Sequence, residues 1–135
     1  MSTILVDNLT GKTSAGDITV TSEGGAATQS LQQGLAKAWV NFDGTGTIAT
    51  RDSLSVSSLA DDGTGLYTVT LSNAMDNANY CINSGARVTN NLRCLASLRY
   101  NFTQTTLAIQ LNSYDTASIL LDASDVFMSI NGDLA

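Results

Sequence analysis

The chain has 135 residues, of which 13% are charged, and its formal net charge is −6, which suits one domain with a small appendage. The negative charge argues against a nucleic-acid-binding protein, because phosphate contacts need clustered Lys and Arg and the six basic residues are scattered. No histidine is present, so the chain lacks the commonest general base and the commonest metal ligand.

Residues 1–25 are expected to form an extended segment. Apolar and polar residues alternate in the run DITVT at 17–21, which is the pattern of a short strand, and a second apolar patch lies at 4–6. Two strands of this size cannot close a core of their own. The start has no basic leader and no long apolar run, so we expect no signal peptide, no membrane insertion and synthesis in a cytoplasm.

Residues 26–38 are predicted to form a short helix, with Thr28 or Ser30 as a possible N-cap. One face of this helix would carry three apolar residues spaced at i, i+4 and i+7, namely Leu31, Leu35 and Ala38. A helix this short, with Gly34 inside it, is marginal in water. Its apolar face therefore needs something to pack against.

A second or third copy of the chain could cover that face. The extended segment before the helix and the β unit after it favour three copies around one axis, since closed cyclic symmetry is usual for homo-oligomers. The expected trimer interface comprises Leu31, Leu35, Ala38, Ile18 and Val20. The alternative is that Leu31, Leu35 and Trp39 pack on the chain's own β unit.

Residues 39–135 show the period-two alternation of short strands separated by turn sequences such as DDGTG and DNAN. Six or seven strands at spacings of roughly ten residues predict an antiparallel β-sandwich or jelly roll. Phe127 is expected to face away from the core. The expected inward sides are Leu54 and Val56; Tyr67, Val69 and Leu71; Cys94, Ala96, Leu98 and Tyr100; Leu107, Ile109 and Leu111; and Val126, Met128 and Ile130.

The chain offers no familiar catalytic arrangement. Nucleophile–histidine pairs are impossible, and the G-x-S-x-G turn, the P-loop and the dinucleotide fingerprint are missing. The candidates for a glycosidase-like carboxylate pair are Asp61, Asp62, Asp115, Asp122 and Asp125. All are expected in turns or at strand edges, where Asp is common because its side chain hydrogen-bonds to the backbone. The DDGT run at 61–64 lacks the spacing of a calcium loop. We therefore expect no enzyme, no cofactor and no metal site.

Two loops are the softer candidates for a binding site. The runs SGARVTNN (84–91) and LNSYDTAS (111–118) suit contacts with sugar or protein, although they also suit an ordinary solvated loop. Their candidate contact residues are Arg87, Asn90, Asn91, Asn112 and Tyr114. The two cysteines, Cys81 and Cys94, could form a bridge or remain free thiols.

The residues also carry a family resemblance. The run SLQQGLAKAW, followed by DGTG, by RDSLSVSS, and then by DDGTGLYTVTLSNAM leading to NYC, resembles the C-terminal module of bacteriophage tail fibres, particularly marine ones. The opening MSTILVDNLTGKTSAG is similar to the start of such fibres. The resemblance covers nearly the whole chain and is densest over residues 17–82.

This resemblance implies a homotrimeric virion protein that is not an enzyme. Residues 1–25 would attach to other tail or capsid proteins, residues 26–38 would form the helix at the threefold axis, and residues 39–135 would form a head that contacts a host-surface glycan or protein. Long fibres carry a shaft between attachment and head, and this chain has almost none. A virion decoration or adaptor protein is therefore the first alternative, and a glycan-cleaving tailspike the second.

Overall fold

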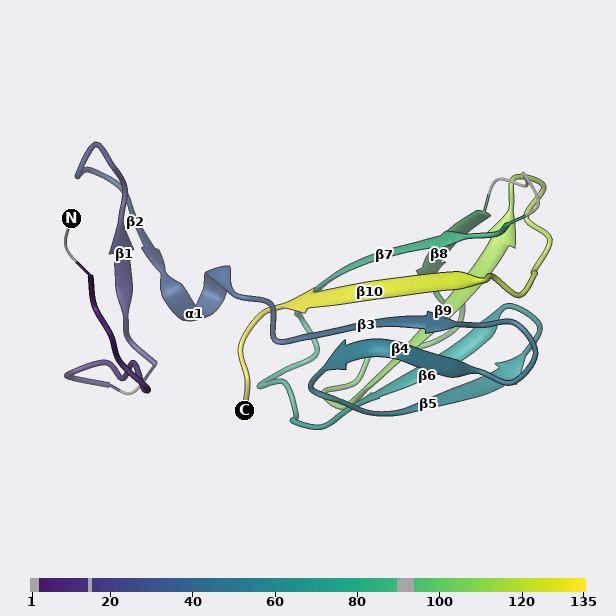
Figure 1. Cartoon of the computed structure of the whole chain (residues 1–135), viewed down its shortest axis with the longest axis horizontal. Helices are drawn as coiled ribbons and strands as arrows, with labels where there is room; N and C mark the ends of the chain where they lie inside the picture. The colour runs from purple at the N-terminus through teal and green to yellow at the C-terminus, as the bar shows by residue number, and fades with distance from the viewer. Residues whose placement is uncertain (1–2, 15, 90–93) are drawn as a thin grey trace. The chain divides into compact units, whose positions relative to one another are not determined.

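A computed structural model of the chain describes residues 3–14, 16–89 and 94–135. The chain divides into two compact units, Met1–Leu35 and Ala36–Ala135 (Figure 1). The predicted all-β class is confirmed, because the described residues form antiparallel strands and one helix of four residues. Within the described part, no helix is long and apolar enough to cross a membrane.

The first unit contains a small hairpin followed by one helical turn. β1 (Thr19–Thr21) pairs antiparallel with β2 (Thr28–Ser30), which confirms a short strand within the run 17–21. α1 (Leu31–Gly34) follows directly. The Ser30 side chain caps it by accepting a hydrogen bond from the Gln33 N–H at 3.4 Å, as the N-cap position requires.

The prediction of a helix over residues 26–38 is wrong except for this single turn. The first part of that segment pairs as β2, which gives its backbone the hydrogen bonds that a marginal helix would have supplied. Leu35 is extended, with ψ 142°, and so ends the helix after Gly34. Ala38 consequently shares no helical face with Leu31 and Leu35. It begins the first strand of the second unit, so that unit starts earlier than the expected head domain.

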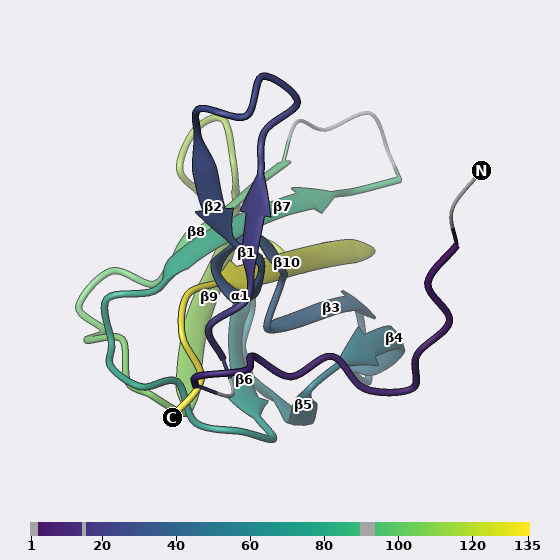
Figure 2. The same cartoon turned by 90° about the vertical axis from the view of Figure 1, so that its left-hand side faces the viewer.

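The second unit is a sandwich of two four-stranded antiparallel sheets, with strand orders β4-β3-β10-β7 and β5-β6-β9-β8. Figure 2 views the sheets from one end and shows them facing each other. The strands are β3 (Ala38–Asp43), β4 (Ala49–Leu54), β5 (Val56–Gly63), β6 (Leu66–Leu71), β7 (Cys81–Arg87), β8 (Cys94–Leu98), β9 (Ala108–Asp115) and β10 (Asp125–Asn131).

Alternation along the central strands builds the core between the two sheets. The Phe42 ring of β3 meets the Tyr67 ring of β6 edge to face, with ring centroids 5.1 Å apart, an arrangement that aromatic quadrupoles favour. Phe127 points outward and is half-exposed, as predicted. The inward residues that the sequence predicted correctly are Tyr67, Val69, Leu71, Ile109, Leu111, Val126, Met128 and Ile130.

The run 52–59 forms two strands in different sheets, where the alternation predicted one. Ser55 lies between them with φ 55°, in the left-handed region that non-glycine residues rarely adopt. Leu54 therefore ends β4 in the first sheet with its side chain exposed, whereas Val56 begins β5 in the second sheet and packs against the core. The prediction that these two side chains share a face is wrong for this reason.

Edge strand β8 departs from its predicted inward side in part. Cys94 and Ala96 pack against the core as expected. β8 ends at Leu98, and the chain then leaves the sheet, so Leu98 is exposed and Tyr100 lies beyond the strand. Leu107 precedes the first residue of β9 and is exposed as well.

Both cysteines are free in the structure. Cys81 begins β7 opposite Asn131, and Cys94 begins β8 opposite Asp115, so they lie in different sheets. Burial raises the pKa of the Cys94 thiol, which lowers the fraction of reactive thiolate.

Candidate functional site

The outer face of the sheet β5-β6-β9-β8 carries the candidate site. Along β9, Ile109, Leu111 and Ser113 point into the core, so the residues between them face outward by the period of a strand. Asn112 is one of these outward residues, and in the antiparallel register it lies opposite Ser97 of β8.

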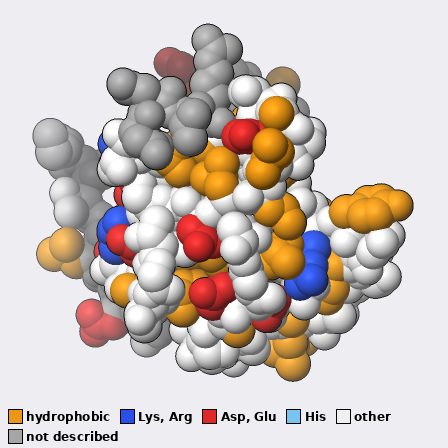
Figure 3. Space-filling model, turned by 90° about the vertical axis from the view of Figure 1, so that its right-hand side faces the viewer, with side chains coloured by type: hydrophobic (Ala, Val, Ile, Leu, Met, Phe, Trp, Pro, Cys, Tyr) orange, Lys and Arg blue, Asp and Glu red, His pale blue; other side chains and the backbone are white. Residues whose placement is uncertain are grey.

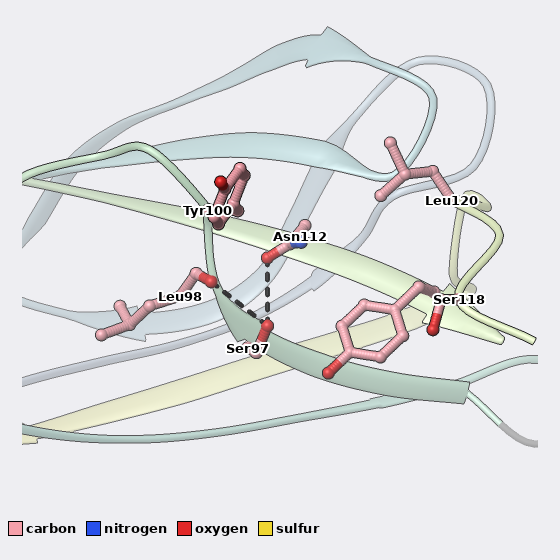
Figure 4. Close-up of a pocket in the computed structure, with 7 residues that line it drawn as sticks. Ser97, Leu98, Tyr100, Asn112, Ser118 and Leu120 are labelled. Atoms are coloured by element: carbon pink, nitrogen blue, oxygen red, sulfur yellow. Dashed lines mark hydrogen bonds between the residues drawn. The ribbon is translucent and has the colours of Figure 1, made fainter. Parts of the chain in front are cut away.

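A pocket of about 270 Å³ opens on this face. It is formed by the end of β8 and the turn after it, by β9, and by the segment that follows β9 (Figure 4). Its lining residues are Ser97, Leu98, Tyr100, Asn112, Tyr114, Ser118 and Leu120. The pocket therefore combines aromatic rings, hydroxyls, one amide and aliphatic side chains, which is a mixture suited to orienting an organic ligand.

The Asn112 side chain is held in place by β8. The Ser97 hydroxyl lies 3.1 Å from the amide and 3.2 Å from the Leu98 carbonyl oxygen (Figure 4). The amide matches its neighbours when its nitrogen faces β8, because Nδ2 then donates to the Leu98 and Ser97 carbonyl oxygens, each at 3.0 Å. An amide carries two donors and one acceptor oxygen, so this orientation leaves Oδ1 able to accept a hydrogen bond from a ligand.

The far wall of the pocket is a short, hydrogen-bonded loop after β9. The Asp115 carboxylate accepts hydrogen bonds from the N–H groups of Ala117 at 2.8 Å and Ile119 at 2.9 Å. Ser118 between them has φ 64°, a left-handed conformation. Leu120 pairs with Tyr114 in an isolated β-bridge. These contacts give the wall a defined shape, as a preformed binding site requires.

A polar cluster lies beside the pocket on the same face. The Thr68 hydroxyl donates to Asp62 Oδ2 at 2.6 Å, and Gln110 Nε2 donates to Thr68 Oγ1 at 3.1 Å. Arg99 Nη1 lies 3.3 Å from Asp62 Oδ2 and 3.4 Å from Gln110 Oε1. Gln110 is two residues before Asn112 on β9, so the cluster and the pocket form one continuous polar surface.

The structure brings together only part of the predicted contact set. Asn112 and Tyr114 both line the pocket, although they belong to β9 and not to a loop. Arg87 ends β7 in the other sheet, and its guanidinium pairs with Asp125 at 2.8 Å. Asn90 and Asn91 lie outside the described residues. Arg87 therefore lies apart from this pocket, and its contact role stays a prediction.

Sequence reasoning missed several residues of this surface. Ser97 and Tyr100 line the pocket, and Arg99 joins the polar cluster next to it. Ser97 meets β9 through the pairing of β8 with β9. The Arg99 N–H donates to the Gln110 carbonyl at 2.9 Å just beyond that pairing, and Tyr100 lies in the turn that follows. The only local hint is Asn101, a residue type that favours turns; it adopts φ 63° directly after Tyr100.

The aspartates considered for catalysis take part in local contacts. Asp61 Oδ1 accepts from the Gly63 N–H at 2.9 Å, and Asp122 Oδ1 accepts from the Gly65 N–H at 2.7 Å. Asp125 pairs with both Arg51 and Arg87. Figure 3 shows acidic side chains interspersed with hydrophobic ones at the end of the sandwich.

The predicted trimer-interface residues divide into two groups. In the first unit, Val20 is 49% exposed and Leu35 is 55% exposed, while Ile18 and Leu31 are half-buried. Ala38 is buried in the core of the second unit, so its place in the interface is a wrong prediction. For the other four residues the interface stays a prediction.

Comparison with known proteins gave one informative likeness. No family model matches the chain, and neither does any curated protein sequence. The fold is similar to the crystal structure of the phiAB6 tailspike in complex with three-repeated oligosaccharides of Acinetobacter baumannii surface polysaccharide, with a TM-score of 0.56 and 12% identity. The match covers 84% of this chain and 23% of the tailspike chain. At this identity the likeness shows a shared fold.

Proposed function

We propose that this chain is a structural protein of a bacteriophage virion, a short trimeric tail fibre whose sandwich unit attaches to the host cell surface. The fold likeness to the phiAB6 tailspike over 84% of the chain carries the proposal. The resemblance to tail-fibre modules, which is densest over residues 17–82, supports it independently, since it rests on sequence runs and not on fold. The pocket on the outer face of the sheet β5-β6-β9-β8 would supply a surface for contact with the host cell.

Attachment would work through several weak sites acting together. A pocket of about 270 Å³ is small for a ligand site, so one copy binds weakly. Three copies in a fibre raise the effective concentration of each site for the next, which strengthens binding without any new contact. The proposed role is attachment without cleavage.

The trimer is tested by mass measurement in solution. The chain has a mass of 14.1 kDa, and we expect a particle of three times this mass at micromolar concentration. The double variant Val20→Ser, Leu35→Ser should dissociate it, because both side chains are exposed in the first unit. Leu107→Ser is the matched control, since it makes the same change at an exposed position in the second unit. A wild-type monomer would contradict the trimer.

Attachment is tested by binding the labelled protein to a panel of bacterial strains and to purified phage particles. We expect saturable binding to at least one strain, with antibody against the chain decorating the tail of the matching particle. Binding to particles without binding to any strain would indicate the decoration or adaptor role instead. Release of reducing sugar from host polysaccharide would indicate a tailspike-like enzyme.

A further inference from the structure

We infer that the pocket beside Asn112 binds one ring of a neutral glycan, with Asn112 Oδ1 accepting a hydrogen bond from a sugar hydroxyl and the two tyrosines flanking the ring. The inference rests on the proposed function and names the ligand of its site. Three features of the pocket carry it: the fixed orientation of the amide, the charges around the pocket, and its size and aromatic lining.

The orientation of Asn112 selects a ligand that can donate a hydrogen bond. Its nitrogen is committed to the carbonyl oxygens of Ser97 and Leu98 at 3.0 Å, which leaves the oxygen for the ligand. A hydroxyl can donate to that oxygen, whereas an ionised carboxylate or phosphate has no proton to donate and would bring lone pairs against lone pairs. The amide is held before binding, so little conformational freedom is lost on contact.

Charge on this face also disfavours an anion. Asp115 directly follows the pocket residue Tyr114, and its carboxylate is held by the N–H groups of Ala117 and Ile119 in the loop that carries Ser118. Arg99 on the same face already contacts Asp62 Oδ2 and Gln110 Oε1. Arg99 is thus already paired, and the Asp115 carboxylate together with the formal net charge of −6 would repel uronic or sialic acids.

The size and lining of the pocket suit a single pyranose ring. A volume of about 270 Å³ is below the range of drug-sized ligand sites. Tyr100 is 83% exposed, and Tyr114 lines the pocket from β9. Tyrosine offers a large rigid apolar surface that loses little entropy on binding, and the C–H face of a sugar ring packs on such a surface. The hydroxyls of Ser97 and Ser118 add further polar contacts at the rim.

The inference is tested with the full chain in its assembled state. The first probes are neutral bacterial polysaccharide fragments and matched fragments that contain uronic or sialic acid, immobilised on an array. We expect binding to at least one neutral fragment and weaker binding to its acidic counterparts. In parallel, target cells are treated either with periodate, which cleaves sugar diols, or with protease. Periodate should abolish cell binding, and protease should leave it intact.

Four variants locate the contact. Asn112→Ala should weaken neutral-glycan binding about tenfold, because a hydrogen bond and its held geometry are lost. Tyr114→Ala should weaken it severalfold, whereas Tyr114→Phe keeps the ring and should bind nearly as wild type. Tyr100→Ala alters a side chain that is 83% exposed, so it should weaken binding while leaving the free energy of unfolding nearly unchanged. Asn83→Ala is the matched control on an exposed strand position of the other sheet, and it should bind as wild type.

The outcomes separate this inference from the proposed function. Cell binding that Asn112→Ala and Tyr100→Ala both leave unchanged would overturn the inference and keep the attachment role. Preference for acidic fragments, or cell binding that protease removes and periodate spares, would overturn it as well. Failure of the wild-type protein to bind any strain would remove the attachment role, and the inference would fall with it.

Discussion

Replacing Tyr67 by phenylalanine should destabilise the sandwich through one hydroxyl group. The side chain is fully buried between the sheets, and its ring contacts Phe42. Its hydroxyl accepts a hydrogen bond from the Ala123 N–H at 3.2 Å and donates to the Gly44 carbonyl at 3.4 Å. The hydroxyl therefore joins the β3–β4 turn to the segment before β10, and burial raises the pKa of the phenol.

The expected loss in the free energy of unfolding can be estimated from the interactions that Tyr67→Phe removes. Phenylalanine keeps the ring packing, so the loss comes from the hydrogen bonds alone. A buried N–H left without its acceptor costs about 1–3 kcal/mol, and the donor bond at 3.4 Å is long enough to add little. For a unit of this size, each kcal/mol lowers the melting temperature by roughly 4–8 °C.

The assay is urea unfolding followed by the fluorescence of Trp39, the only tryptophan, at one fixed protein concentration because assembly adds to stability. Tyr114→Phe is the control, since that tyrosine lies on the outer face; it should change the free energy of unfolding by no more than about 0.5 kcal/mol. A Tyr67→Phe variant within about 0.5 kcal/mol of wild type would refute the proposed role of the hydroxyl.

Two further predictions concern the same unit. Gly65→Ala should destabilise it by roughly 1–3 kcal/mol in urea unfolding, because Gly65 has φ 64° and an added Cβ would lie 2.5 Å from the Ser113 carbonyl oxygen; a neutral result would mean that this turn can relax. Alkaline titration should lower stability above pH 10, because burial raises the pKa of Tyr80 to about 12. The unfolded chain releases this proton near pH 10, whereas the folded chain keeps it until about pH 12. The unfolded state therefore gains about 1.4 kcal/mol per pH unit between these values, and Tyr80→Phe should flatten the stability profile over this interval.

The alternation of apolar residues predicted the sandwich well where a strand lies inside a sheet. β6, β9 and β10 each have neighbouring strands on both sides. One face of each is therefore buried along nearly the whole strand, and apolar residues recur at every second position. The prediction of one strand over residues 52–59 is wrong because the alternation of apolar residues continues through Ser55, where the backbone turns from one sheet to the other. No local property of a serine predicts such a turn.

The prediction of a helix over residues 26–38 is wrong for a related reason. The spacing of Leu31, Leu35 and Ala38 suits a helical face, yet the backbone of 28–30 finds a partner in β1 instead. Pairing with another segment decides whether such residues form a helix or a strand, and the spacing of apolar residues does not reveal that pairing.

Only part of the candidate pocket could be predicted from the sequence. The sequence predicts Asn112 and Tyr114 as contact residues, and both line the pocket. Residue types alone do not point to their neighbours, because the register between β8 and β9 places Ser97 there and the turn after β8 places Tyr100 there. A pairing hypothesis for these two strands would have been needed to find the site from the sequence.

The turn of the chain at Ser55 affects whether edge strands of neighbouring molecules can pair. β4 and β5, the outermost strands of opposite sheets on one side, are joined by this one residue, and irregular registers interrupt the pairing of both. On the opposite side, the Ser84 hydroxyl of β7 donates to the Ala96 carbonyl of β8 at 3.2 Å. Neither flank is a long, regular template for backbone pairing between molecules. Copies brought close together would therefore meet through their side chains, and strand-by-strand polymerisation is disfavoured.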